Sequence, residues 1–196
     1  MKKIISIVLL LAAISGASAQ DSDKLTTIKG KKYDLTEYTS GPSFVTNEEA
    51  AAAFYYTRDG YAVINVALRE QKRSAIDRKA KVILNLASLV NKSKKGKCTF
   101  YRFIDGNSTL LDQIKTKGQV FIERGFFSAT LDASPDDDGH FSNKEYVIKG
   151  TSDRCAEISG YSSFQGENEV LFPPGTKFVV TKNMHGKKIY LREELE

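Results

Sequence analysis

The chain has 196 residues, which suits one domain, and its 41% hydrophobic and 27% charged residues are ordinary for a soluble globular protein. Its formal net charge of +5 falls to +3 if Lys2 and Lys3 are removed with an N-terminal leader. This mild surplus does not favour a nucleic acid partner, for which a dense basic stripe is expected, and we expect none.

Residues 1–19 have the three parts of a secretory signal peptide. Lys2-Lys3 is a positive start, Ile4 to Ile14 is an apolar run, and Ala17-Ser18-Ala19 fits a cleavage site. The run is shorter than the roughly 20 residues that span a bilayer, so a membrane anchor is the weaker alternative. We expect cleavage after Ala19, a secreted or periplasmic protein, and no membrane partner after cleavage.

Residues 20–43 are polar and form an N-terminal lead-in, and residues 44–196 are expected to form the folded domain. Helical signals begin at Thr46, which has capping-box spacing to Glu49. An alanine-rich run continues the helix until Asp59-Gly60 interrupts it, and a helical pattern resumes up to Arg69. Apolar side chains at steps of three and four between residues 76 and 90 predict another helix that faces a core.

After Cys98 the hydrophobic period changes to two, which is typical of strands. A short helix is expected around residues 110–114. Helices followed by many short strands indicate an α+β fold and not alternating strands and helices. The further strand-like runs are residues 119–122, 126–131, 146–149, 169–172, 177–181 and 188–191.

The only two cysteines are Cys98 and Cys155. Export would permit a disulfide between them, but two buried free thiols fit the sequence equally well because it does not fix their distance. The sequence has no C-x-x-C, no H-E-x-x-H and no cluster of Cys and His, so we expect no metal site.

Three features could carry chemistry. Arg102 lies within the apolar run Phe100-Tyr101-Arg102-Phe103-Ile104, where a buried guanidinium needs a partner such as a phosphate. Ser128 lies in the hydrophobic segment 125–130 and could hold a carboxylate by a hydrogen bond. Each has a plainer alternative: Arg102 could point to water at a strand edge, and Ser128 could be a satisfied hydroxyl in a core strand.

Glu167 and Glu169 form the third feature, because an extended backbone points both carboxylates to the same side, roughly 7 Å apart. One carboxylate could stabilise positive charge on a sugar while the other accepts a proton from an incoming nucleophile. The alternative is an exposed acidic loop, which is the commoner use of this pattern.

The order of these features resembles the arginine–serine–glutamate branch of the ADP-ribosyltransferase exoenzyme toxin family. The resemblance covers roughly residues 44–191 and includes the two carboxylates of an E-x-E motif. It implies an α+β fold in which N-terminal helices pack on a split β-sandwich of two short sheets that enclose an NAD cleft. The matching stretches are Tyr55 to Arg69, Tyr101-Arg102, Gly118 to Thr130, Ile158 to Phe164, and Glu167 to Pro174.

The resemblance also implies roles for four catalytic residues. Arg102 is expected to bind the phosphates of NAD, and Ser128 to orient Glu169. Glu169 is expected to engage the nicotinamide ribose and stabilise the charge that develops there. Glu167 is expected to contact the acceptor, and a Glu at this position accompanies arginine acceptors in the family.

Further residues are expected to line the NAD cleft or to meet a protein partner. By the same resemblance, Tyr56, Tyr61 and Asn65 would line the cleft, although both tyrosines could instead be core aromatics. Tyr161 and Phe164 would recognise the substrate protein. The chain has Ser128-Ala129-Thr130 where the family has Ser-Thr-Ser, and the loop after it has no Arg, so Lys144 is a possible substitute on the phosphates.

The resemblance therefore implies a secreted mono-ADP-ribosyltransferase that uses NAD as co-substrate, with residues 44–196 as its catalytic domain. The expected partner is a target protein with an acceptor arginine, and a separate component could deliver the enzyme. The alternatives are an NAD glycohydrolase on the same fold, with water as acceptor, and a catalytically inactive binding module.

Overall fold

A computed structural model describes residues 27–28, 31–32, 45–93, 95–133, 144–164 and 166–194. The predicted signal peptide and most of the predicted lead-in lie outside these residues. Within the described part, a two-stranded antiparallel pair joins β1, Thr27–Ile28, to β2, Lys31–Lys32. No helix in the described ranges is long and apolar enough to cross a membrane.

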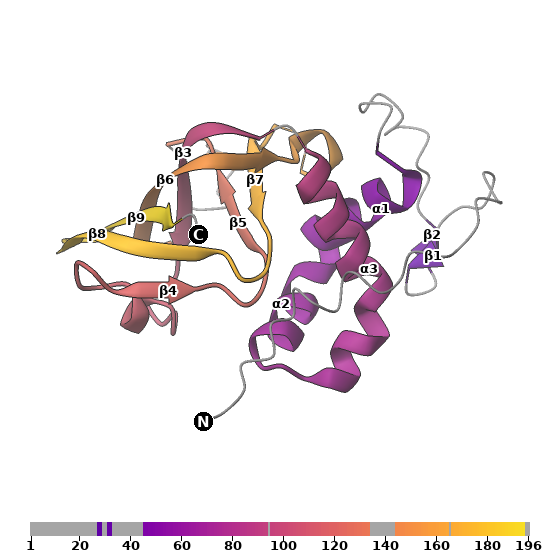
Figure 1. The fold of residues 1–196 in the computed structure, drawn as a ribbon, viewed down its shortest axis with the longest axis horizontal. Coiled ribbons are helices and arrows are strands. Elements are labelled where there is room, and N and C mark those ends of the chain that lie inside the picture. Colours follow the sequence, from indigo (N-terminus) through magenta and orange to yellow (C-terminus); the bar gives the residue numbers. More distant parts are fainter. Residues whose placement is uncertain are drawn as a thin grey trace.

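The helices form one layer, drawn in indigo to magenta in Figure 1. The predicted capping box is confirmed: Thr46 Oγ1 accepts from the Glu49 backbone N–H, and Glu49 Oε2 accepts from the Thr46 N–H at 2.9 Å. The predicted break at Asp59-Gly60 is a π-helical turn and not a helix end. This turn is η3, Tyr56–Gly60, and the α-helices are α1 Asn47–Tyr55, α2 Tyr61–Arg69 and α3 Arg73–Lys92.

Glu49 ties α1 to α3. Its side chain is buried, yet it accepts a hydrogen bond from Ser88 Oγ and forms a 2.7 Å ion pair with Lys92 Nζ. Burial alone would raise the pKa of Glu49, but these contacts prevail and lower it. The paired carboxylate lies beside an apolar core of both helices, which includes Tyr55, Leu86 and Leu89.

The strands follow the helices, so the predicted α+β fold is confirmed. Their hydrogen bonds form one seven-stranded sheet in the order β3-β5-β7-β6-β9-β8-β4, and an added β3–β6 pairing joins the two halves that were expected as separate short sheets. The bounds are β3 Lys95–Ile104, β4 Val120–Ile122, β5 Phe127–Thr130, β6 Tyr146–Glu157, β7 Glu169–Phe172, β8 Lys177–His185 and β9 Lys188–Glu194, with short 3-10 turns at η4 Leu111–Gln113 and η5 Ser159–Tyr161.

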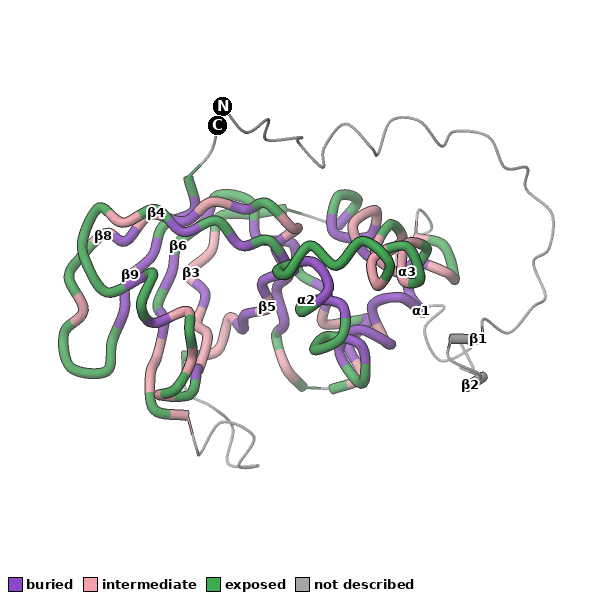
Figure 2. Tube along the Cα trace, turned by 90° about the horizontal axis from the view of Figure 1, so that it is seen from below, coloured by how far each residue is buried: buried purple, intermediate pink, exposed green. Residues whose placement is uncertain are grey.

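The two halves of the sheet pack face to face on a second core. Phe100, Phe127, Phe172 and Phe178 come from four strands, and their ring centroids lie 4.9–6.0 Å apart. These rings are buried. Figure 2 shows buried segments, in purple, along the strands of the sheet. Cys98 and Cys155 form a disulfide between β3 and β6, which resolves the choice that the sequence left open.

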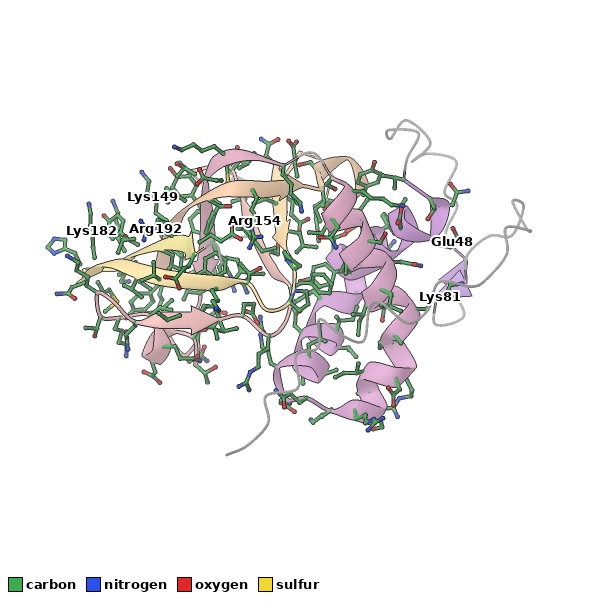
Figure 3. The ribbon with its side chains drawn as sticks, viewed as in Figure 1. Glu48, Lys81, Lys149, Arg154, Lys182 and Arg192 are labelled. Atoms are coloured by element: carbon green, nitrogen blue, oxygen red, sulfur yellow. A yellow bond between two sulfur atoms is a disulfide. The ribbon has the colours of Figure 1, made fainter. Side chains whose placement is uncertain are left out.

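Charged side chains cover the outer face of the sheet. Figure 3 shows Lys149, Lys182 and Arg192 on the side of the molecule away from the helices, with Arg154 nearer the middle. Lys149 Nζ lies 5.7 Å from the centroid of Tyr101, so one of these cations also covers an aromatic ring. The strands nearest the helical layer in Figure 1 are β5 and β7, and this junction is where the predicted site residues gather.

Candidate active site

Arg102, Ser128 and Glu169 lie on three adjacent strands, and both Arg102 and Glu169 hydrogen-bond with Ser128. Strand β3 pairs with β5 at Tyr101 and Thr130, and Thr130 in turn pairs with Glu169 at the start of β7. Arg102 Nη1 donates to the Ser128 carbonyl oxygen at 2.9 Å, and Ser128 Oγ donates to Glu169 Oε1 at 2.7 Å. The sheet therefore brings together three residues that are separated by 67 positions in the sequence.

Glu169 is a buried carboxylate with hydroxyl groups around it. Its exposed fraction is only 6%. Burial raises its pKa, hydrogen bonds with Ser128 and Ser162 lower it, the charge of Glu167 raises it, and the net pKa is above the ordinary value. The site thus places a carboxylate where water screens its charge poorly, which strengthens its attraction for any positive charge that develops nearby.

Arg102 packs on an aromatic ring at the same place. Its Cζ lies 4.6 Å from the centroid of Phe127, and burial lowers the pKa of its guanidinium. Its hydrogen-bond acceptor in the structure is a backbone carbonyl, which uses one of the five N–H donors of the guanidinium.

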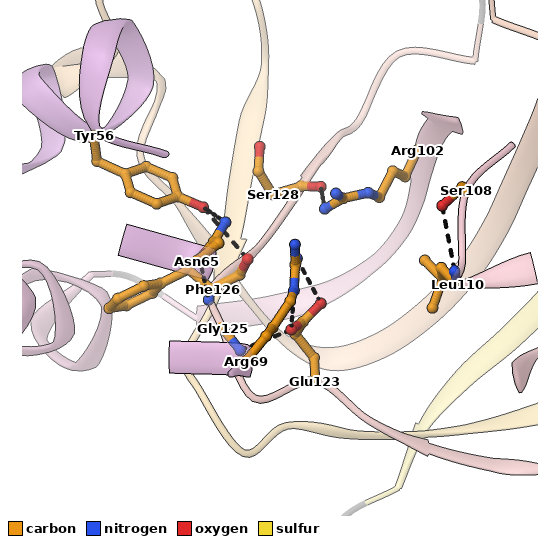
Figure 4. A network of polar contacts seen from close by, with 10 residues as sticks. All are labelled: Tyr56, Asn65, Arg69, Arg102, Ser108, Leu110, Glu123, Gly125, Phe126 and Ser128. Carbon is orange, nitrogen blue, oxygen red and sulfur yellow. Dashed lines mark hydrogen bonds and ion pairs between the residues drawn. The ribbon is translucent and has the colours of Figure 1, made fainter. Parts of the chain in front are cut away.

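Tyr56 and Asn65 form the helical wall of the site (Figure 4). Asn65 Nδ2 donates to the Tyr56 hydroxyl at 2.9 Å, and Asn65 Oδ1 accepts from the Phe126 backbone N–H at 2.8 Å. A Cβ on Gly125 would lie only 2.7 Å from Asn65 Oδ1, so glycine is needed for this close approach. Tyr56 and Asn65 therefore fix the entry to β5, and Tyr56 is a core aromatic as well as a residue of the site.

Arg69 and Glu123 belong to the site, although the sequence reasoning missed them. Arg69 donates to both carboxylate oxygens of Glu123, from Nε and Nη2, at 2.9 Å each, and Glu123 Oε1 also accepts from the Gly125 N–H. Burial would lower the pKa of Arg69, but the hydrogen bonds and charge of Glu123 raise it. Figure 4 shows the guanidinium of Arg69 pointing toward that of Arg102, and the two cations are close enough to interact electrostatically.

The other predicted site residues lie around this centre. Tyr61 begins α2 with 56% of its surface exposed, and Glu167 is half-buried, with its carbonyl accepting from the Glu169 N–H at 2.9 Å. Phe164 is 36% exposed, but Tyr161 is only 7% exposed and packs in the helical core. The ring of Tyr161 therefore anchors its loop, which suits direct contact with a partner less well than the exposed ring of Phe164 does.

Two further expectations concern cations. Lys144 Nζ pairs with both carboxylate oxygens of Asp105, at 2.9 and 3.0 Å. Arg69 is also paired, but it acts electrostatically on Arg102, so it is better placed than Lys144 as a second cation beside Arg102. Within the ranges that the structure describes, no group of three or more His, Cys, Asp or Glu residues is placed to hold a metal ion.

Comparisons with known proteins identify the family of this chain. The model of the ADP-ribosyltransferase exoenzyme family matches residues 22–193. The chain belongs to this family.

One similar curated protein and two similar structures illustrate the relationship. A putative NAD(+)–arginine ADP-ribosyltransferase, Mav, of Mycobacterium avium (strain 104) is 30% identical over 135 residues, which are 68% of this chain but only 16% of that protein. The ADP-ribosyltransferase toxin Plx2a of Paenibacillus larvae is 22% identical with a TM-score of 0.66, covering 81% of this chain and 92% of that one. The Clostridium limosum C3 exoenzyme is 20% identical with a TM-score of 0.64, covering 82% and 89%. These two structures confirm the fold.

The residues of the candidate site suit NAD as a ligand. NAD has two negatively charged phosphates, and the donor set of the site contains two guanidinium groups that point toward each other, those of Arg69 and Arg102. Arg is well suited to phosphate because its planar donors bind two oxygens at once.

Proposed function

We propose that this ADP-ribosyltransferase transfers ADP-ribose from NAD to an arginine side chain of a target protein and releases nicotinamide. The observation that carries the proposal is the 2.7 Å hydrogen bond from Ser128 to the buried carboxylate of Glu169, with a second carboxylate, that of Glu167, two residues earlier. NAD supplies the ADP-ribosyl group and the bond to nicotinamide that breaks.

We assign the binding of NAD to both arginines and the helical wall. Arg102 and Arg69 hold the phosphates, and Glu123 and Phe127 keep the two guanidinium groups in place. The exposed ring of Tyr61 offers a flat apolar surface for stacking. Tyr56 and Asn65 support β5 from behind, so that Ser128 stays within hydrogen-bond distance of Glu169.

We assign the chemical step to the two carboxylates. Glu169 accepts a hydrogen bond from Ser128, which fixes one carboxylate oxygen, and its negative charge stabilises the positive charge that develops on the ribose. Glu167 is more exposed than Glu169 and lies at the end of the loop that bears Phe164. Its carboxylate can bind an incoming guanidinium through two hydrogen bonds and accept the proton that the guanidinium loses when it bonds to the sugar.

The identity of the acceptor rests on Glu167 and on the relative from M. avium, whose name includes arginine.

We also propose that residues 1–19 are a signal peptide, that the mature protein is secreted or periplasmic, that it acts on a protein partner and that a separate component delivers it. The export proposal rests on the positive start, apolar run and small-residue cleavage site in the sequence.

The test measures two products from NAD labelled in its adenylate half: ADP-ribose on a polyarginine acceptor, and free ADP-ribose. Glu169→Gln is expected to lower both by at least about 100-fold, the usual cost of removing a preorganised electrostatic group. Glu167→Gln is expected to suppress transfer while hydrolysis continues.

The matched control is Glu48→Gln, in the first turn of α1 on the far side of the helical layer (Figure 3), which should change neither product. Undiminished transfer by Glu167→Gln would contradict the arginine assignment. Free ADP-ribose without labelled polyarginine or labelled protein in a cell lysate would favour an NAD glycohydrolase. Absence of both products from the unaltered protein would favour a binding module.

A further inference from the structure

The side chain of Thr57 hydrogen-bonds the loop between β6 and β7 to the helical layer. We call residues 158–168 the acceptor loop, of which the structure describes all but residue 165. Thr57 Oγ1 accepts a hydrogen bond from the Ser163 backbone N–H at 2.9 Å and lies 3.2 Å from Ser163 Oγ. Thr57 is only 7% exposed, so water competes poorly for these contacts.

Thr57 belongs to the same π-helical turn as the wall of the NAD site. Tyr56, which hydrogen-bonds with Asn65, is the residue before Thr57, and Tyr61 follows the last residue of the turn. A Cβ on Gly60 would lie 2.5 Å from the ring of Tyr55, so the turn depends on glycine there. Single π-turns within helices are rare and are frequent at functional sites. The five-residue π-helical turn thus contributes Tyr56 to the NAD site and hydrogen-bonds the acceptor loop through Thr57.

The contact between Thr57 and Ser163 lies between two functional parts of the acceptor loop: Ser162, which contacts Glu169, and Glu167, which we assign to the acceptor. Ser162, next to Ser163, hydrogen-bonds with Glu169 and accepts from the Phe164 N–H at 3.2 Å. Glu167 follows Ser163 by four residues. Glu169, in contrast, starts a strand that pairs with β5 along its whole length, from Phe172 to Glu169. The position of Glu169 therefore depends on the sheet, whereas Tyr161 anchors the first part of the preceding loop and Thr57 holds Ser163, between Tyr161 and Glu167.

We propose that Thr57 is a positioning residue that holds the acceptor loop for transfer and thereby sets the ratio of ADP-ribose transfer to NAD hydrolysis. The proposal rests on the proposed function, because it assigns Glu167 to the acceptor. Without the Thr57 hydroxyl, the Ser163 N–H loses its acceptor, and the part of the loop after Tyr161 loses these hydrogen bonds to the helical layer. Glu169 keeps its contact with Ser128, so the cleavage of NAD by water is retained.

The experiment measures transfer to polyarginine and hydrolysis of NAD in parallel for two variants of the full chain. Thr57→Val keeps the shape of the side chain but removes the hydroxyl, and is expected to lower the ratio of transfer to hydrolysis about tenfold. Thr57→Ser retains the hydroxyl and is expected to keep the ratio within about twofold of the unaltered protein. A role in packing alone would change both products in proportion and would leave the ratio fixed.

A third variant tests the positioning role of Thr57 if Thr57→Val does not fold. Ser163→Ala removes one of the two contacts with Thr57 and is expected to lower the ratio about threefold. An unchanged ratio in Thr57→Val, or in Ser163→Ala where Thr57→Val is unfolded, overturns the proposal. An unaltered protein that forms neither product contradicts the proposed function, and an active one with a ratio insensitive to Thr57 contradicts only the positioning role.

Discussion

The groups around Glu169 have opposing effects on its pKa. Burial and the charge of Glu167 favour its protonated form, whereas hydrogen bonds from Ser128 and Ser162 favour the carboxylate. Burial prevails, so the folded protein holds a proton on Glu169 at a higher pH than an exposed carboxyl group would. Because the proposed chemistry needs the ionised form, activity and protonation are linked through this one residue.

The neighbours of Glu169 should therefore move the pH profile in opposite directions. NAD hydrolysis is expected to fall as the pH drops through the pKa of Glu169, which lies above its ordinary value of 4.5. Ser128→Ala removes a contact that lowers the pKa, so its acid limb should move to higher pH. Glu167→Gln removes a charge that raises the pKa, so its acid limb should move to lower pH. The measurement is kcat/KM for NAD against pH, and shifts of the same sign in both variants would contradict this account.

At the scale of elements, β3 carries both Arg102 and one end of the disulfide. Cys98 lies four residues before Arg102, and its partner Cys155 lies 57 positions along the chain, on β6. Strand β3 also pairs with β6 from Lys95 to Ile104. The disulfide thus fastens together the two strands through which the halves of the sheet join.

Removing the disulfide should destabilise the protein without changing its fold. A loop of 57 residues corresponds to a stabilisation of about 4 kcal/mol in the chain-entropy account. Cys98→Ser with Cys155→Ser is expected to lower the free energy of unfolding by about this amount, measured by urea denaturation. The unaltered protein should fall to the same value in reductant, to which the double variant should be indifferent. Equal stability with and without reductant would rule out a stabilising disulfide.

The sequence predicts those elements whose patterns are local. The capping box at Thr46 and the strand Glu169–Phe172 have the predicted bounds because spacing and hydrophobicity specify them directly. Strand β6 runs to Glu157, well beyond the predicted residue 149, because Gly150 and polar residues interrupt its apolar pattern. The π-turn is likewise hidden, since the sequence signal of Asp59-Gly60 is that of a helix break.

Within the site, too, the sequence predicts residues that belong to local motifs and misses those that depend on long-range packing. Arg102, Ser128 and Glu169 belong to motifs that can be read in order along the chain. Arg69 looks like an ordinary cation in the last turn of a helix, and its partner Glu123 lies 54 positions away. Their pairing depends on how α2 docks against the segment that leads into β5, which no local pattern specifies. Long-range docking of this kind is the part that required the structure.

The part of the molecule that the structure describes has two apolar cores, and the site lies where they meet. Tyr56 and Phe126 belong to the helical core, and their rings are 5.5 Å apart, whereas Phe127, the next residue, belongs to the core of the sheet. Arg69–Glu123 and Thr57–Ser163 also join helical residues to segments that flank the strands. A ligand held by Arg69 and Arg102 would therefore bind both parts of the molecule at once.

Ionisation of Glu169 also bears on the stability of this junction. Because its folded pKa lies above the unfolded value, its contribution to stability is present below the unfolded pKa and is lost as the pH rises through the folded pKa. Above the folded pKa, the ionised carboxylate is thus a cost that Glu169→Gln removes. This variant should be at least as stable as the unaltered protein, and it should bind NAD without consuming it.

NAD should then stabilise Glu169→Gln against heat. A ligand that binds only the folded state contributes about 2.7 kcal/mol at a concentration of 100 times its Kd. For a chain of this size, that corresponds to an increase in Tm of roughly 5–10 °C, measurable by scanning calorimetry. Adding Arg102→Met, which keeps an apolar stem against Phe127 but removes the guanidinium, should abolish most of the increase. An equal increase in both variants would show that Arg102 does not hold the phosphates. No increase in either would mean that the junction of the two cores does not bind the dinucleotide.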